Sequence, residues 1–199
     1  MKKIILMLLI SCPITQLLGQ QSNDNKKIAL DILTESIQLL ESNLGELKTA
    51  SLSYKPKDNG WTILNCLEHL AIVEKTLNEK LKEIINSGKI DLDKNLSSND
   101  WLVIAKITDR TNKVNTPAPF RPKPEFKDKS KEFFLNEIKT LRKDLIVFLS
   151  STKVDLRHVF APYIYGEADA IQHAVIIGAH MHRHTMQIQE ILEEEKANN

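Results

Sequence analysis

Four long stretches of the chain repeat apolar residues every three or four positions, which is the spacing of one face of an α-helix. No stretch after residue 19 alternates apolar and polar residues for long enough to predict a β-sheet. Amphipathic helices of 20 or more residues can bury their apolar faces only against one another. The pattern therefore predicts an all-α fold, an up-down-up-down four-helix bundle. The four helices are expected at about residues 26–50, 62–87, 128–151 and 168–195.

The connection between the second and third of these helices is much longer than the others. It covers about residues 88–127, with a short helix expected near 99–108 and four prolines between Pro117 and Pro124. A connection of this length inside a compact domain is usually functional or mobile. From Lys106 to Lys131 it carries eight basic and three acidic residues. If the crossover is a lid over a binding site, its positive charge would favour an anionic substrate. The alternative is a solvated loop whose basic side chains simply face water.

The first 19 residues have the features of a secretory signal peptide. Lys2 and Lys3 precede a mostly apolar run that is short for a membrane span, and Gly19 offers a small residue before the cut. Two alternatives are an N-terminal membrane anchor and a lipoprotein leader whose Cys12 becomes lipidated. The sequence thus predicts an exported protein, periplasmic or extracellular, whose mature form is one domain at residues 20–199 without a membrane span.

The mature domain would be nearly neutral, with 25 basic against 26 acidic residues once Lys2 and Lys3 are removed. Such a balance provides no excess of positive charge with which to bind nucleic acid. Cys66 would be the only remaining cysteine, so an internal disulfide is excluded and stability must come from the core. A buried apolar thiol is the favoured interpretation of Cys66, ahead of a metal ligand.

Three of the six histidines are expected to face the bundle interior. His180 and His184 lie four apart on one helix face, and His184 falls on the apolar seam of that helix. His69 lies three after Cys66 and so points inward from the second helix. Three buried imidazoles need polar partners. One shared divalent metal ion would satisfy all three, and a separate backbone carbonyl for each is the alternative.

Neighbouring residues have subsidiary expected roles. Gln187, three after His184, can reach the site as an orienting or substrate-contacting amide. His173 lies about 10 Å along the helix from His180 and would reach the site at most indirectly. Glu68 is expected to face solvent, as is His182, and His158 lies in a loop.

Two stretches, residues 54–70 and 180–188, resemble the DinB/YfiT-like superfamily of metal-dependent bundle proteins. The residues that carry the resemblance are Pro56, Trp61, Thr62, His69, Leu70, His180, His184 and Gln187. The resemblance implies a four-helix bundle with His69, His180 and His184 as ligands of a divalent ion such as zinc, nickel or iron. It spans about residues 26–195. Asn65 departs from it, because the family often has Glu at that position to close a capping box.

Activities that the resemblance implies are transfer or isomerisation reactions that use low-molecular-weight thiols, which are cytosolic; export would separate the protein from them. An ion held by three neutral histidines leaves an open position and can lower the pKa of a bound water molecule or thiol. The sequence therefore predicts a hydrolase or thiol-dependent S-transferase that acts on a small-molecule substrate. The chain has no His-Glu-x-x-His motif of a zincin protease. The alternative is a non-catalytic bundle in which the metal ion holds the second and fourth helices together and the outer surface binds a partner. A homodimer is also expected from an exposed apolar seam.

Overall fold

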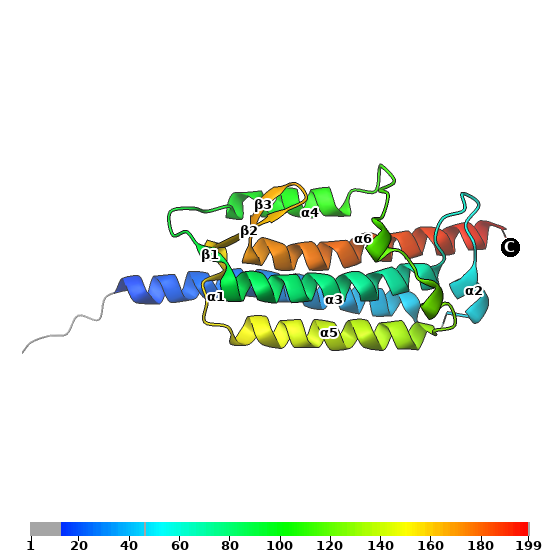
Figure 1. Ribbon diagram of the computed structural model, residues 1–199, viewed down its shortest axis with the longest axis horizontal. Coiled ribbons are helices and arrows are strands. Elements are labelled where there is room, and N and C mark those ends of the chain that lie inside the picture. Colours follow the sequence, from blue (N-terminus) through cyan, green and yellow to red (C-terminus); the bar gives the residue numbers. More distant parts are fainter. Residues whose placement is uncertain (1–12, 46, 199) are drawn as a thin grey trace, which may run out of the picture.

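The computed structural model describes residues 13–45 and 47–198, with side chains from residue 24 onward, and this part of the chain is mainly helical. Four long helices lie side by side in an elongated bundle (Figure 1). They are α1 (Pro13–Leu44), α3 (Ile63–Ser87), α5 (Lys131–Ser151) and α6 (Ala170–Asn198). The predicted all-α four-helix bundle is confirmed. The predicted limits of α3, α5 and α6 agree with the structure to within about three residues, whereas α1 begins earlier than predicted and ends at Leu44 instead of about residue 50.

The directions of the four helices differ from the prediction. Ile32 and Asn43 of α1 lie against Gly178 and Gln189 of α6, so these two helices run parallel. Lys26 of α1 bonds the carbonyl of Thr152 after α5, and Glu41 pairs with Lys139, so α1 runs antiparallel to α5. Figure 1 shows α3 and α5 running the same way, which gives an up-down-down-up bundle. The up-down-up-down order was wrong because the crossover contains a helix, α4 (Asp100–Thr108), that leads the chain back to the end where α3 began.

Shorter elements lie between the long helices. They are the helix α2 (Thr49–Ser53), four 3-10 turns (Ser97–Asn99, Ala118–Phe120, Pro124–Phe126 and Leu156–His158), and the strands β1 (Lys89–Ile90), β2 (Val159–Tyr163) and β3 (Gly166–Asp169). The strands form an antiparallel sheet in the order β1-β2-β3. The expectation of no sheet was wrong, since strands of two to five residues are too short to show an alternating pattern.

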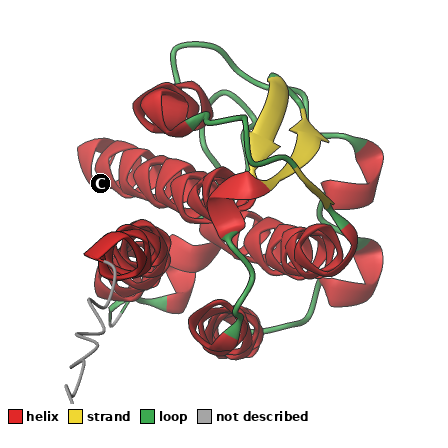
Figure 2. Ribbon diagram, turned by 90° about the vertical axis from the view of Figure 1, so that its left-hand side faces the viewer, coloured by secondary structure: helices red, strands yellow, loops and turns green. Residues whose placement is uncertain are grey.

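The sheet and α4 lie outside the four long helices, on one side of the bundle (Figure 2). Arg157 joins them, because its guanidinium bonds Asp100 at the start of α4 at 2.6 Å and Asp169 at the end of β3 at 3.0 Å. Gln172 adds a bond from its amide nitrogen to Asp100 at 3.0 Å. This buried network fixes the first half of the crossover against the start of α6.

Local side-chain contacts define where α3 and α6 begin. Thr62 caps α3: its hydroxyl accepts from the Asn65 N–H, and the Asn65 side chain accepts from the Thr62 N–H, each at 3.2 Å. Asn65 therefore closes the capping box, at a position where the resemblance led us to expect Glu. Asp169 and Gln172 make the same reciprocal pair at the start of α6. These caps set the rotation of the two helices that carry the three predicted histidines.

The apolar core forms two clusters, one toward each end of the bundle, with charged and polar side chains between them. Arg142 of α5 occupies this middle layer and is 1% exposed. Its guanidinium makes a two-point ion pair with Glu74 of α3, at 2.7 and 2.8 Å, and also donates to the Ser36 hydroxyl at 2.7 Å. The histidine-bearing turn of α6 borders this layer, since Arg142 also contacts the sulfur of Met181 at 3.7 Å.

The predicted leader lies mostly outside the described residues, which begin at residue 13; Cys12 lies outside them altogether. Where α1 is described with side chains, its buried residues start at Ala29. A cut after residue 19 would therefore leave the described core intact. Among the described residues, no helix has the length and apolar character needed to cross a bilayer.

Candidate metal centre

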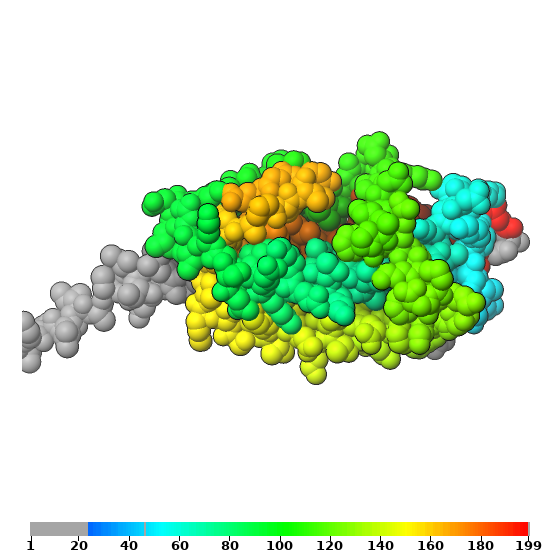
Figure 3. All heavy atoms as spheres, in the orientation of Figure 1, coloured from blue at the N-terminus to red at the C-terminus, as the bar shows by residue number. Residues whose placement is uncertain are grey.

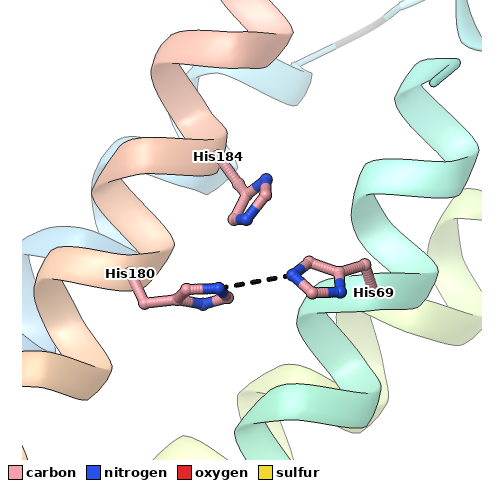
Figure 4. Close-up of side chains that lie close together, drawn as sticks. All are labelled: His69, His180 and His184. Carbon is pink, nitrogen blue, oxygen red and sulfur yellow. Dashed lines mark hydrogen bonds between the residues drawn. The ribbon is translucent and has the colours of Figure 1, made fainter. Parts of the chain in front are cut away.

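The three predicted histidines come together between α3 and α6. His69 lies in the second turn of α3, and His180 and His184 lie one turn apart on α6 (Figure 4). One ring nitrogen of each lies within 4.8 Å of one from each of the others. Elsewhere in the described chain, no His, Cys, Asp or Glu side chain completes the group as a fourth member.

The orientation of His69 is set by the crossover. Its Nδ1 lies 2.7 Å from the backbone carbonyl oxygen of Phe120, and its Nε2 lies 3.3 Å from Nε2 of His180. A carbonyl oxygen can only accept, so Nδ1 of His69 carries the proton and Nε2 carries the lone pair. The nitrogen able to bind a metal is thus the one that faces the other histidines.

His184 is oriented in the same way by a side chain of its own helix. Its Nδ1 lies 2.9 Å from the side-chain oxygen Oε1 of Gln187. With Nδ1 as the donor, Nε2 of His184 is left with a lone pair. Gln187 stands where the sequence placed an orienting amide. Metal-binding histidines usually donate their second ring N–H to such an oxygen.

All three imidazoles are neutral at neutral pH. His69 and His184 are 4% and 7% exposed, and His180 is partly exposed. Burial lowers the pKa of His69, and burial followed by the neighbouring His69 lowers the pKa of His184 to about 3. Burial, then His184 and His69, puts the pKa of His180 well below its usual value. The neutral form is the one that binds metal ions.

The separation of the His69 and His180 nitrogens fits a shared divalent cation. Two imidazole nitrogens bound to one tetrahedral zinc ion at the usual Zn–N distance of about 2.0 Å lie about 3.3 Å apart. The His69 and His180 Nε2 atoms are 3.3 Å apart. The Phe120 carbonyl satisfies only one nitrogen of His69. Without a metal ion, an N–H of His180 could donate to Nε2 of His69 or to Nε2 of His184, but not to both. The remaining nitrogen would lack a hydrogen-bond donor, which is unfavourable in a buried site.

Trp61 borders the cluster on the α3 side. Its ring centroid lies 4.9 Å from that of His69 and 6.3 Å from that of His184, with the latter rings nearly parallel. The residue precedes the Thr62 cap, so the start of α3 and the position of the indole are set together. The indole thus packs against two of the three imidazoles.

The comparisons with known proteins agree with this architecture. A sequence profile of the DinB superfamily matches residues 32–188. The chain belongs to the DinB superfamily. It is 29% identical over 153 residues to the uncharacterized protein YuaE of Bacillus subtilis, a match that covers 76% of this chain and 90% of YuaE.

A solved structure has the same fold. It is YfiT from Bacillus subtilis, described as a probable metal-dependent hydrolase with an unusual four-helix bundle topology. The TM-score is 0.60 at 14% identity, and the match covers 86% of this chain and 87% of YfiT. At this identity the similarity concerns the fold.

The other histidines of this DinB protein lie away from the cluster. Nε2 of His173 is 3.3 Å from the carbonyl of Ala161 in β2, so this residue ties α6 to the sheet and does not support the site. His158 pairs with Asp155 at 2.9 Å in the 3-10 turn before β2. His182 is partly exposed and lies outside the cluster.

Cys66 lies one turn before His69 and is fully buried. Burial raises the pKa of its thiol to about 12. A thiol with so high a pKa stays protonated at neutral pH and is a poor metal ligand. The interpretation of Cys66 as a buried apolar thiol agrees with its place in the core.

Glu68 was expected to face solvent, and the structure contradicts this. The side chain is 4% exposed, and its carboxylate accepts a hydrogen bond from the backbone N–H of Lys123 in the crossover. Burial raises its pKa. The expectation failed because it considered only the four long helices, whereas the crossover covers this face of α3. Phe120 was missed for the same reason, since its contribution is a backbone carbonyl that no residue pattern indicates.

Proposed function

We propose that this DinB protein binds one divalent metal ion through Nε2 of His69, His180 and His184 and uses it as a hydrolase or thiol-dependent S-transferase acting on a small molecule. The observation that carries the proposal is the convergence of these ring nitrogens, with the second nitrogens of His69 and His184 already bonded to oxygen acceptors. The description of YfiT as a probable metal-dependent hydrolase supports the hydrolytic alternative by analogy.

When bound, the ion would supply a Lewis acid that lowers the pKa of a water molecule or thiol and thereby provides a nucleophile at neutral pH. The residues of the chain prepare the site for it. Phe120 and Gln187 hold the protons of His69 and His184 on the nitrogens that face away from the cluster. The burial of His69 and His184 limits their contact with water, which strengthens electrostatic interactions inside the site.

A catalytic ion is favoured over a purely structural one for two reasons. Structural zinc sites have four protein ligands, whereas the cluster in the described residues has three. In addition, the apolar clusters and the Arg142–Glu74 ion pair already join α3, α5 and α6 without the histidines. The bundle therefore has a core independent of the ion.

Removal of the metal tests this proposal. The protein is purified without a histidine tag, stripped with a chelator and reloaded with zinc, nickel or iron, and each form is assayed against esters, amides and thiol acceptors. A catalytic ion predicts that the stripped form keeps its helical circular dichroism and loses turnover, which returns on reloading. If stripping unfolds the bundle and no reloaded form turns over any substrate, the ion is structural and the proposal of catalysis is wrong.

A further inference from the structure

Glu68 makes a buried contact with a part of the crossover that offers few donors. Its carboxylate accepts from the backbone N–H of Lys123 and is 4% exposed. Lys123 lies between Pro122 and Pro124, and proline has no N–H. The Lys123 N–H is therefore the one backbone donor in this tripeptide, and Glu68 takes it.

The contact lies directly beside the one that orients His69. Glu68 and His69 are consecutive on α3, and their partners Lys123 and Phe120 are three residues apart in the crossover. One side chain of α3 accepts from the crossover backbone and the next donates to it. The two bonds attach the 3-10 turns Ala118–Phe120 and Pro124–Phe126 to α3 at two adjacent points.

Stronger attachments flank this segment, at Arg110, which pairs with Glu190, and at Phe126, whose ring lies 6.2 Å from that of Phe134; those within it are weak. None of residues 111–125 is buried. The ion pair of Lys113 with Asp58 joins side chains that are 82% and 50% exposed, and such pairs contribute little. Arg121 bonds Thr116 within the same segment. Figure 3 shows the segment, in green to yellow-green, lying across α3. A segment with so few buried contacts opens easily unless its hydrogen bonds hold it.

We propose that Glu68 is a positioning residue: it fixes the crossover against α3 so that the Phe120 carbonyl holds the His69 ring with its Nε2 directed into the cluster. The effect on metal affinity rests on the proposed function, whereas the effect on the crossover and on the His69 tautomer does not. Metal-binding histidines lose affinity when the groups that orient them are removed, typically by a factor of about 10 to 100.

Two substitutions separate the hydrogen bond from the charge. Glu68→Gln keeps an oxygen that can accept from the Lys123 N–H, and Glu68→Leu removes every acceptor at similar size. Glu194→Leu is the matched control, because Glu194 also accepts from a backbone N–H, that of Lys57, at 2.8 Å, but near the end of α6 away from the cluster. Circular dichroism establishes that each variant folds; Glu68→Ala, which also removes the acceptor, takes the place of Glu68→Leu if that variant does not fold.

Amide exchange and nitrogen-15 histidine spectra of the metal-free protein give the first readout. We expect Glu68→Leu to raise exchange in residues 118–127 by about tenfold or more and to weaken the Nδ1–H signal of His69. Glu68→Gln and Glu194→Leu should resemble the wild type in both. Unchanged exchange and an unchanged His69 signal in Glu68→Leu would overturn the proposal. If Glu68→Ala is the acceptor-free variant that folds, raised exchange in residues 118–127 supports the proposal and wild-type exchange overturns it.

Metal competition titration gives the second readout. Glu68→Leu should bind zinc about tenfold more weakly or worse, with Glu68→Gln close to the wild type. Wild-type affinity in Glu68→Leu would refute the metal-related part of the proposal. A wild-type protein that binds no metal would refute the proposed function, and the exchange and tautomer results would still decide the role of Glu68.

Discussion

The Nε2 atoms of His69 and His180 lie 3.3 Å apart although the residues are separated by 111 positions in the chain. The antiparallel packing of α3 and α6 brings them together, and His184 joins them from the next turn of α6 (Figure 4). Because the pKa values of all three imidazoles are lowered by burial, the cluster presents neutral nitrogens and no positive charge. It is therefore prepared for a cation.

Gln187 is predicted to tune the metal site without binding the ion. Replacing it by Leu removes the acceptor that lies 2.9 Å from Nδ1 of His184. We expect Gln187→Leu to weaken zinc affinity by about 10- to 100-fold at unchanged stoichiometry, measured by competition with a chromophoric chelator. Gln189→Leu is the control, since Gln189 lies on the same helix and bonds Asn43 instead. Equal affinities for the two variants would show that Gln187 does not orient the ring.

Arg142 is predicted to be essential for stability as one member of a pair. Arg142→Met leaves the Glu74 carboxylate buried without its partner, which should lower the free energy of unfolding by about 3 to 5 kcal/mol. Urea denaturation of Arg142→Met, Glu74→Leu and the double variant measures the coupling. The double variant should be more stable than Arg142→Met. Additive losses would mean that the two side chains do not act as a pair.

Cys66 gives a prediction for alkaline pH. Its pKa is raised by burial to about 12, against 9.0 for an ordinary thiol, so the unfolded chain loses this proton first as pH rises above 9. The free energy of unfolding should fall by about 1.4 kcal/mol per pH unit from this group between pH 9 and 12, and the contribution is fully present below pH 9. Denaturation curves of wild type and Cys66→Ala at several pH values test this, because the variant should lack that slope. Equal slopes would contradict the assignment.

The same burial predicts an unreactive thiol. Cys66 in the folded protein should react with iodoacetamide at pH 8 far more slowly than in urea, because the thiolate is the reacting form and the side chain is 0% exposed. Rapid alkylation of the folded protein, followed by mass spectrometry, would show that this part of the core opens readily.

Gly178 is predicted to be required for close packing of α1 and α6. A Cβ at this position would lie 2.4 Å from Cγ2 of Ile32 and 3.1 Å from its backbone oxygen. Gly178→Ala should therefore lower stability by about 1 to 3 kcal/mol, even though alanine is the better helix former by about 1 kcal/mol. Thermal unfolding measures the loss. Adding Ile32→Ala should make the combined loss less than additive, and a stabilised Gly178→Ala would contradict the packing.

The helices of this fold could be predicted from the sequence, but their directions could not. The three-to-four-residue spacing of apolar side chains identifies the buried face of a helix and says nothing about which end of the bundle the next helix starts from. That depends on the path of the crossover. The path is fixed by contacts such as Arg157 with Asp100, which join residues far apart in the chain.

The candidate site was predictable where it consists of side chains on regular helices. His69, His180, His184 and Gln187 follow from helical spacing and the family resemblance. Phe120 contributes a carbonyl from an irregular segment, so no side-chain pattern could indicate it. Arg142 was missed because a charged residue was not expected at a core position of α5. Export, lipidation at Cys12 and pairing into a homodimer stay predictions.

The metal content of the purified protein tests the central claim most directly. The tag-free wild type and a His180→Ala, His184→Ala double variant are prepared in parallel without chelator, reconstituted with zinc, nickel or iron, and analysed by mass spectrometry. We predict about one equivalent of metal in the wild type and none in the double variant, with both retaining helical circular dichroism. A wild type that holds no metal after reconstitution would contradict the account and identify the three histidines as residues of the core.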